Sequence, residues 1–119
     1  MTDISASIAA LPEKTLLVLD DDGPLRTRLA RALESRGFEV VQAGTVSEAI
    51  TVVKDKCPAF AVLDMRLEDG NGLQVVETIQ TVRPEARVVM LTGYGNIATA
   101  VAAVKAGAVD YLQIGRAHV

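Results

Sequence analysis

The chain has 119 residues, half of them apolar, a formal net charge of −3 and a single cysteine, Cys57. This length suits one domain with a real hydrophobic core and is too short for two. The apolar runs fall far short of the roughly 18 residues that a membrane-spanning helix needs. One cysteine excludes an internal disulfide and a multi-cysteine zinc site, and an acidic chain without a basic stripe argues against a nucleic-acid-binding surface.

Residues 1–14 are interpreted as an N-terminal leader. The first twelve residues are small and mildly apolar, and they lack the basic start and long apolar centre of a secretory signal peptide. We therefore expect a cytoplasmic protein that does not enter a membrane.

After the leader, short continuous apolar runs alternate with amphipathic segments of helical period. Such runs are typical of parallel strands buried on both faces, with the intervening helices packed against the sheet. We predict strands at 15–20, 38–43, 59–64, 87–91 and 109–112. The four predicted helices begin near Pro24, at a Thr45 or Ser47 cap, at Leu73 and near Ile97, and end at Gly37, Lys56, Val82 and Ala106. This alternation predicts an α/β fold with a doubly wound parallel sheet.

Carboxylates gather where two of these strands end. Asp20, Asp21 and Asp22 follow the first predicted strand, and Asp64 ends the third. Ligands of open α/β sheets bind at the carboxyl ends of the strands, so these side chains should meet at one rim. Two unit charges about 4 Å apart at an effective dielectric near 20 cost about 4 kcal/mol, which is too much for an unexplained cluster. A helix cap would explain Asp22 alone. A solvated acidic turn without a ligand is the simplest alternative for the acidic run. A bound Mg²⁺ would explain the whole cluster.

Asp64 has two possible roles in this chemistry. It can be a third metal ligand, or it can be a nucleophile that accepts a phosphoryl group, as aspartyl carboxylates do in some phosphoryl-transfer proteins. Thr92 ends the fourth predicted strand, and its hydroxyl can donate to a phosphoryl oxygen beside the Gly93 N–H. A strand-end threonine on its own is more often a cap, so the combination of residues is what makes phosphoryl transfer the specific interpretation.

The same residues resemble the motif set of bacterial response-regulator receiver domains. The matching positions are Asp20-Asp21, Asp64, Thr92-Gly93 and Tyr111. Their spacings agree with that family, at 44 residues from the first to the second position, then 28 and then 19. The resemblance covers residues 16–113. The amino-acid sequences of residues 67–73 and 91–101 are similar to those of the PrrA/RegA/ActR group of redox-responsive regulators of photosynthesis and energy metabolism.

The resemblance implies a flavodoxin-like (CheY-like) fold with five parallel strands in the order 2-1-3-4-5. It implies a phosphoacceptor that catalyses only its own phosphorylation and dephosphorylation, and so is not an enzyme in the usual sense. The phosphoryl donor would be a phosphohistidine on a sensor histidine kinase. The conformational switch would control transcription through a DNA-binding output domain that this chain does not contain.

The resemblance also assigns roles around the cofactor, which would be Mg²⁺. Asp64 would be the phosphoacceptor and a metal ligand. Asp21 would bind the ion directly and Asp20 mostly through water, and the backbone carbonyl of Arg66 would complete the protein ligands.

The switch is expected farther along the chain. In the resembled family the hydroxyl at Thr92, with Gly93 beside it, moves toward the phosphoryl group and the ring at Tyr111 follows it inward. The family then carries a lysine and a proline just after strand five, where this chain has Ile114 and Gly115. The cation that would pair with the phosphoryl group is therefore replaced by an apolar side chain.

Residues 114–119 are interpreted as a non-native tail, because the match is close up to Gln113 and then stops. The receiver domain would cover residues 15–113, with its fifth helix missing. Helices one and five share one face of such a sheet, so we expect part of that face to be bare and apolar. A homodimer or a domain-swapped assembly would cover it.

Three other interpretations compete with the receiver domain. The pattern Gly93-x-Gly95-x-x-Ala98 superficially matches a dinucleotide-binding turn, but it follows the fourth strand and leaves the acidic cluster unexplained. A Mg²⁺-dependent phosphatase would also use Asp64 as a nucleophile, but such an enzyme needs a further acid beside the nucleophile, and Met65 and Arg66 do not supply one. An interaction module with a vestigial, signalling-incompetent site is favoured only by Ile114.

Overall fold

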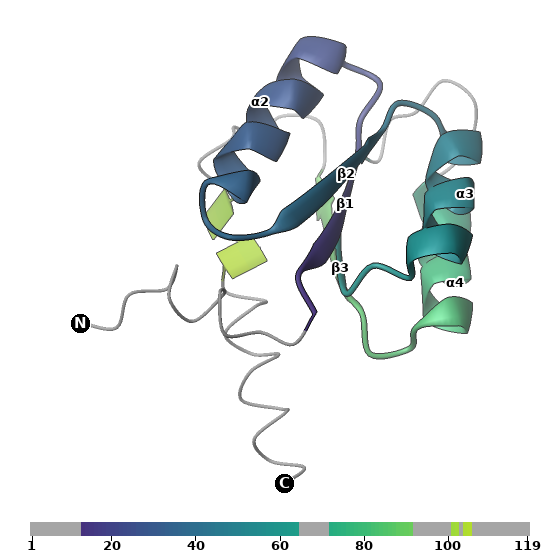
Figure 1. Cartoon of the computed structure of the whole chain (residues 1–119). Helices are drawn as coiled ribbons and strands as arrows, with labels where there is room; N and C mark the ends of the chain where they lie inside the picture. The colour runs from purple at the N-terminus through teal and green to yellow at the C-terminus, as the bar shows by residue number, and fades with distance from the viewer. Residues whose placement is uncertain (1–12, 65–71, 92–100, 103, 106–119) are drawn as a thin grey trace, which may run out of the picture.

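The computed structural model describes residues 13–64, 72–91, 101–102 and 104–105, and these form a parallel sheet between two layers of helix (Figure 1). The strand order is β2-β1-β3-β4, and every pair of neighbours is parallel. The strands are β1 (Thr15–Leu19), β2 (Glu39–Ala43), β3 (Phe60–Asp64) and β4 (Arg87–Leu91). The helices are α2 (Gly23–Glu34), α3 (Val46–Lys56) and α4 (Gly72–Val82).

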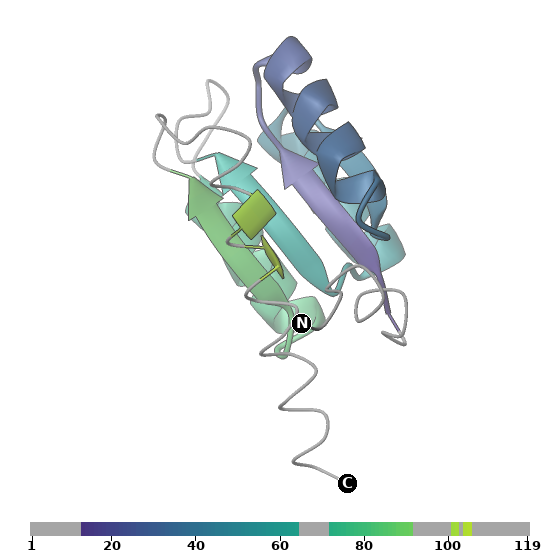
Figure 2. The ribbon, with the colours of Figure 1, turned by 90° about the vertical axis from the view of Figure 1, so that its left-hand side faces the viewer.

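Alternate residues of the central strands divide the core into two halves. Leu16 and Val18 of β1 join the core cluster that contains α2, whereas Leu17 and Leu19 join the one that contains α3 and α4. This is the two-residue period of a strand that is buried on both faces. Figures 1 and 2 show the corresponding layers, with α2 on one face of the sheet and α3 and α4 on the other. The continuous apolar runs of the sequence are therefore explained by burial on both sides.

The helix starts are set by short polar side chains. The Asp22 side chain accepts a hydrogen bond from the Leu25 N–H at 3.0 Å and caps α2. Of the two caps predicted for α3, Thr45 is the one observed, since its Oγ1 accepts from the Glu48 N–H at 3.1 Å. Each bond satisfies a backbone donor that has no partner within the helix.

A residue with positive φ follows each of the first two helices. α2 ends at Glu34, three residues before the predicted end at Gly37, and Ser35 is its C-cap in the right-handed region. Gly37, with a φ of 107°, ends the turn that leads from α2 to β2. Cys57, with a φ of 47°, is the C-cap of α3 and turns the chain toward β3. The sequence did not predict this conformation at Cys57, because a non-glycine residue seldom adopts it.

The face of the sheet that carries α2 is covered by more than that helix. Helix one alone was expected to cover it, but Val101 and Val104 are 6% and 2% exposed and belong to the same core cluster as α2. Figure 2 shows this short helical piece against the sheet. It shields the interior of β1 and β3, whereas all five residues of β4 are half-buried. The apolar periodicity of the sequence predicts a helix that ends at Ala106, but it does not predict the face of the sheet against which this helix packs.

The order 2-1-3-4 is confirmed, and the strand boundaries differ from the predicted ones by single residues. β1 ends at Leu19, one residue before its predicted end, and β2 and β3 each begin one residue later than predicted. Residues 1–12 of the predicted leader (1–14), the predicted fifth strand (109–112) and the tail (114–119) lie outside the described residues. Within the described ranges, none of the helices has the length and apolar character needed to cross a membrane.

The packing predicts how two leucines differ in their contribution to stability. Leu17 is fully buried against the α3 side, so Leu17→Ala should lower the free energy of unfolding by roughly 2–5 kcal/mol. Leu73 is 50% exposed, and Leu73→Ala is the matched control with a much smaller expected loss. Urea unfolding followed by circular dichroism measures both, and equal losses would contradict the described core.

Candidate functional site

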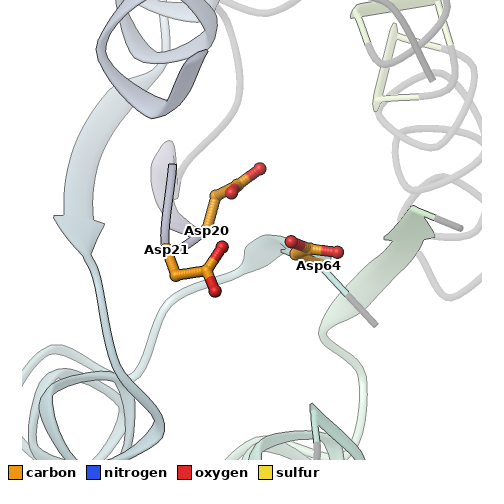
Figure 3. A group of neighbouring side chains, drawn as sticks. All are labelled: Asp20, Asp21 and Asp64. Carbon is orange, nitrogen blue, oxygen red and sulfur yellow. The ribbon is translucent and has the colours of Figure 1, made fainter. Parts of the chain in front are cut away.

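Three carboxylates meet at the carboxyl ends of β1 and β3. Leu19 of β1 pairs with Leu63 of β3, so the residues that follow them, Asp20 and Asp64, emerge on neighbouring strands. Each of Asp20, Asp21 and Asp64 offers a carboxylate oxygen, and these oxygens all lie within 4.8 Å of one another. Figure 3 shows the three side chains projecting into the same space. The expected meeting of the acidic pair with the lone strand-end carboxylate is therefore observed.

The three carboxylates differ in their access to solvent. Asp20 is only 5% exposed, Asp64 is half-buried, and Asp21 is exposed. Asp20 Oδ1 accepts a hydrogen bond of 2.9 Å from the Asp22 N–H. Asp20 is thus the inner wall of the site, whereas Asp64 and Asp21 can be reached from outside.

Burial raises the pKa of the Asp20 carboxyl above its usual value. The hydrogen bond from Asp22 N–H lowers the pKa, while the neighbouring charges, with Asp64 first and then Asp21 and Asp22, raise it further. The net effect is a raised pKa, so ionisation of Asp20 in the folded protein is opposed first by burial and then by the neighbouring carboxylates. A cation between the carboxylates would relieve the repulsion among them.

The donor set fits a hard divalent cation. Mg²⁺ takes oxygen ligands at about 2.0–2.1 Å, so neighbouring ligands in its octahedral shell lie about 3 Å apart and opposite ones about 4 Å. Carboxylate oxygens within 4.8 Å of one another are close enough for one ion to be held directly by some of them and through water by another. Asp20, Asp21 and Asp64 could therefore hold one Mg²⁺.

Asp22 has a different task from its two neighbours. Its carboxylate caps α2 through the Leu25 N–H, and it does not belong to the group of oxygens that could share an ion. The sequence predicted this division, because a helix cap accounted for one member of the acidic run and left two for the site.

The structure adds one residue that the sequence did not single out. Arg26 lies in the first turn of α2, and its Nη1 donates to the backbone carbonyl of Asp20 at 2.8 Å. Its Nε donates to Oε1 of Gln42, at the end of β2, at 3.2 Å. In the sequence, Arg26 is one of several charged residues of an amphipathic segment, and no motif marks it. A long cationic side chain one turn after an acidic loop was the available signal.

The remaining predicted site residues cannot be placed. Arg66, Thr92, Gly93, Tyr111 and Ile114 lie outside the described residues. Asp64 pairs with Leu91 in the sheet, and Leu91 immediately precedes Thr92 in the sequence.

Comparison with known proteins gives the same family over almost the whole chain. Residues 16–113 match the response regulator receiver domain. The photosynthetic apparatus regulatory protein RegA of Rhodobacter capsulatus is 61% identical over 100 residues, which cover 84% of this chain and 54% of that protein. The acid tolerance regulatory protein ActR of Rhizobium meliloti is 55% identical over 101 residues, covering 85% of this chain and 52% of that protein. The chain therefore spans about half the length of these relatives.

A solved structure shares both the fold and recognisable sequence. It is a response regulator protein from Burkholderia pseudomallei with a phosphorylated aspartic acid, a calcium ion and citrate. The TM-score is 0.65 at 36% identity, and the match covers 83% of this chain and 55% of that one. A phosphorylated aspartic acid and a divalent cation thus occur together in a protein with this fold.

The crowding of carboxylates predicts how stability depends on pH when metal is removed. In the folded protein the pKa of Asp20 lies above its usual value of 3.8, so the folded state keeps this proton to a higher pH than the unfolded state. The free energy of unfolding should therefore fall as the pH rises from 3.8 through the raised pKa. Asp20→Asn lacks this loss, so with EDTA it should be more stable than the unmutated chain at pH 7.

Urea unfolding at pH 7 and at pH 3.5 or below measures this difference. The advantage of Asp20→Asn should shrink at the lower pH, where the unmutated carboxyl is largely protonated in both states, and it should also shrink when Mg²⁺ replaces EDTA. A variant that is less stable than the unmutated chain at pH 7 in EDTA would contradict the description of Asp20 as a strained carboxylate.

Proposed function

The chain belongs to the response regulator receiver domain family, and we propose that its Asp64 accepts a phosphoryl group from a sensor histidine kinase beside a bound Mg²⁺. Receiver domains are regulatory phosphoacceptors that in general bind Mg²⁺ in an acidic pocket. The single observation that carries the assignment to Asp64 is its position at the end of β3, within 4.8 Å of Asp20 and Asp21.

In the proposed chemistry the three carboxylates have different roles, and Asp64 is the nucleophile. An Asp64 oxygen attacks phosphorus, the P–N bond of the phosphohistidine breaks, the imidazole leaves, and an acyl phosphate remains on Asp64. Bound Mg²⁺ supplies positive charge against the incoming phosphoryl oxygens. Asp20 is less suited to attack because it is only 5% exposed, whereas Asp64 is half-buried. Later attack by water on the acyl phosphate returns the Asp64 carboxylate and inorganic phosphate, so the domain catalyses only its own turnover.

The family resemblance supplies the remaining roles in this proposal. The Arg66 carbonyl would be a further metal ligand. Thr92 and Gly93 would contact the phosphoryl group, and Tyr111 would follow Thr92 when the domain switches. Ile114 stands where the family has a lysine, so the response of the switch to phosphorylation should be weaker in this chain.

The proposal for the whole protein goes beyond this chain. We assign residues 15–113 to the receiver domain, 1–14 to a leader and 114–119 to a non-native tail. A cytoplasmic regulator that acts on DNA through a separate output domain is supported by relatives that are named as regulatory proteins and of which the match covers only about half. Those relatives are named for the photosynthetic apparatus and for acid tolerance. Together with the resemblance to redox-responsive regulators, they support redox-linked transcriptional regulation as the proposal, with photosynthesis as its candidate target.

Self-association is also part of the proposal, in the form of a homodimer or a domain-swapped assembly. Its support is β4, whose residues Arg87–Leu91 are all half-buried although β3 beside it is almost fully buried. Light scattering at micromolar concentration should give a dimer mass, and a monomer at every concentration would contradict this part of the proposal.

Phosphorylation by a small donor tests the assignment of Asp64. Acetyl phosphate or phosphoramidate with Mg²⁺ should add one phosphoryl group to the chain, observed as a change in intact mass. Asp64→Asn should abolish the addition because an amide cannot act as the nucleophile. Asp55→Asn, on the exposed side of α3, is the matched control and should be labelled normally.

The outcomes separate the competing interpretations. Equal labelling of Asp64→Asn would show that another residue is the acceptor. No labelling of the unmutated chain would favour a vestigial interaction module, and rapid turnover of unrelated phosphate esters would favour a phosphatase.

A further inference from the structure

Arg26 connects the loop after β1 to the end of β2 at the rim of the acidic site. Its Nη1 donates to the backbone carbonyl of Asp20 at 2.8 Å, and its Nε donates to Gln42 Oε1 at 3.2 Å. Asp20 follows β1 and Gln42 belongs to β2, so a single guanidinium spans the ends of two neighbouring strands. The backbone adds a parallel link, because the Asp20 N–H donates to the Ala43 carbonyl at 3.2 Å.

The loop that Arg26 holds is the one that carries the acidic pair. Arg26 N–H donates to the Asp22 carbonyl at 2.8 Å, which fixes the start of α2, and the side chain then turns back to Asp20. Asp22 N–H donates to Asp20 Oδ1. Hydrogen bonds from the first turn of α2 therefore hold both Asp20 and Asp22, and Asp21 lies between these two residues.

Gly44 makes room for the guanidinium. A methyl group added at Gly44 would lie 2.9 Å from Nη1 of Arg26 and 3.6 Å from its Cζ, which is too close for the present position of that side chain. The Gly44 backbone does not have a positive φ, so space and not conformation distinguishes glycine from alanine at this position. The guanidinium is thus surrounded by the Asp20 carbonyl, the Gln42 amide oxygen and the Gly44 backbone.

The contacts of Arg26 favour a geometric role over a purely electrostatic one. Its nitrogens contact a backbone carbonyl and a neutral amide oxygen, and neither of these oxygens carries a charge. Mg²⁺ demands nearly ideal octahedral geometry, so small displacements of its ligands weaken binding. Groups that hold metal ligands without touching the metal typically contribute roughly 10–100-fold to affinity or activity.

We infer that Arg26 is a positioning residue that holds the Asp20-Asp21 loop in the geometry needed to bind Mg²⁺ and so to phosphorylate Asp64. That Arg26 holds the loop follows from its contacts. That this affects Mg²⁺ binding and phosphorylation rests on the proposed function. Arg26 need touch neither the ion nor the phosphoryl group to act in this way.

Magnesium titration of variants tests the consequence. Arg26→Ala should raise the Kd for Mg²⁺ by roughly 10-fold or more and slow labelling by acetyl phosphate at limiting Mg²⁺, with recovery when Mg²⁺ is raised. Arg28→Ala, an exposed arginine on the same helix, changes the net charge equally and should leave both unchanged. Gly44→Ala keeps every charge but must move the guanidinium, so a smaller loss in the same direction is expected.

Arg26→Lys separates geometry from charge. A lysine keeps the positive charge but has one nitrogen, which cannot reproduce the two contacts of the guanidinium. Its Kd should therefore stay close to that of Arg26→Ala, and the loss should persist at high salt. Full recovery with lysine, or an Arg26→Ala chain that binds Mg²⁺ as the unmutated chain does, would overturn the inference.

A measurement without metal keeps this test distinct from the proposed function. Backbone ¹⁵N relaxation in EDTA should show lower order parameters at Asp20, Asp21 and Asp22 in Arg26→Ala, with the amides of β3 unchanged. Unchanged order parameters at these three residues would overturn the positioning role even if Asp64 is phosphorylated. Conversely, an unmutated chain that fails to bind Mg²⁺ would contradict the proposed function, while the relaxation data would still decide whether Arg26 holds the loop.

Discussion

The meeting of three carboxylates at the carboxyl ends of β1 and β3 is the constraint on which the rest of the site depends. The parallel register places Leu19 beside Leu63, so the strands deliver Asp20 and Asp64 to the same point of the rim. The strands themselves are held there by apolar side chains buried on both faces, at 0–2% exposure through β1 from Leu16 and through β3 to Leu63. The favourable free energy of that burial offsets the unfavourable approach of like charges. The fold thus maintains an acidic cluster that would separate in a less constrained chain.

The polar contacts around the cluster have a different purpose from the core. Asp22 caps α2 and its N–H donates to Asp20, so one residue both starts the helix and limits the movement of the acidic pair. Arg26 extends this arrangement to β2 through Gln42. Each of these bonds involves a carboxylate or a guanidinium and is expected to contribute at most about 3 kcal/mol to stability. Their importance lies in geometry, because a hard cation with strict ligand angles responds to displacements that barely affect the folding free energy.

The sequence predicted those parts of the structure that depend on local or strand-level rules. Runs that are apolar at every position predicted parallel strands, and the strand ends predicted that Asp20, Asp21 and Asp64 would meet. The caps at Asp22 and Thr45 were also predictable, since each needs a partner only three residues away. The bridge from Arg26 to Gln42 was not, because it joins residues 16 apart whose proximity depends on the order of the strands. The face on which Val101 and Val104 pack was missed for the same reason, since helical period does not determine the path of the connection.

The central claim is that Asp20, Asp21 and Asp64 act as one site for one cation, and carboxylate NMR tests it most directly. The side-chain ¹³Cγ shifts of the three aspartates would be followed during a Mg²⁺ titration, with the exposed Asp55 as an internal reference. All three shifts should change along one binding curve with a single Kd, while Asp55 stays unchanged. Three curves with different midpoints, or a response at Asp21 and Asp55 alone, would mean that Mg²⁺ only screens exposed charge and that the cluster is not a metal site.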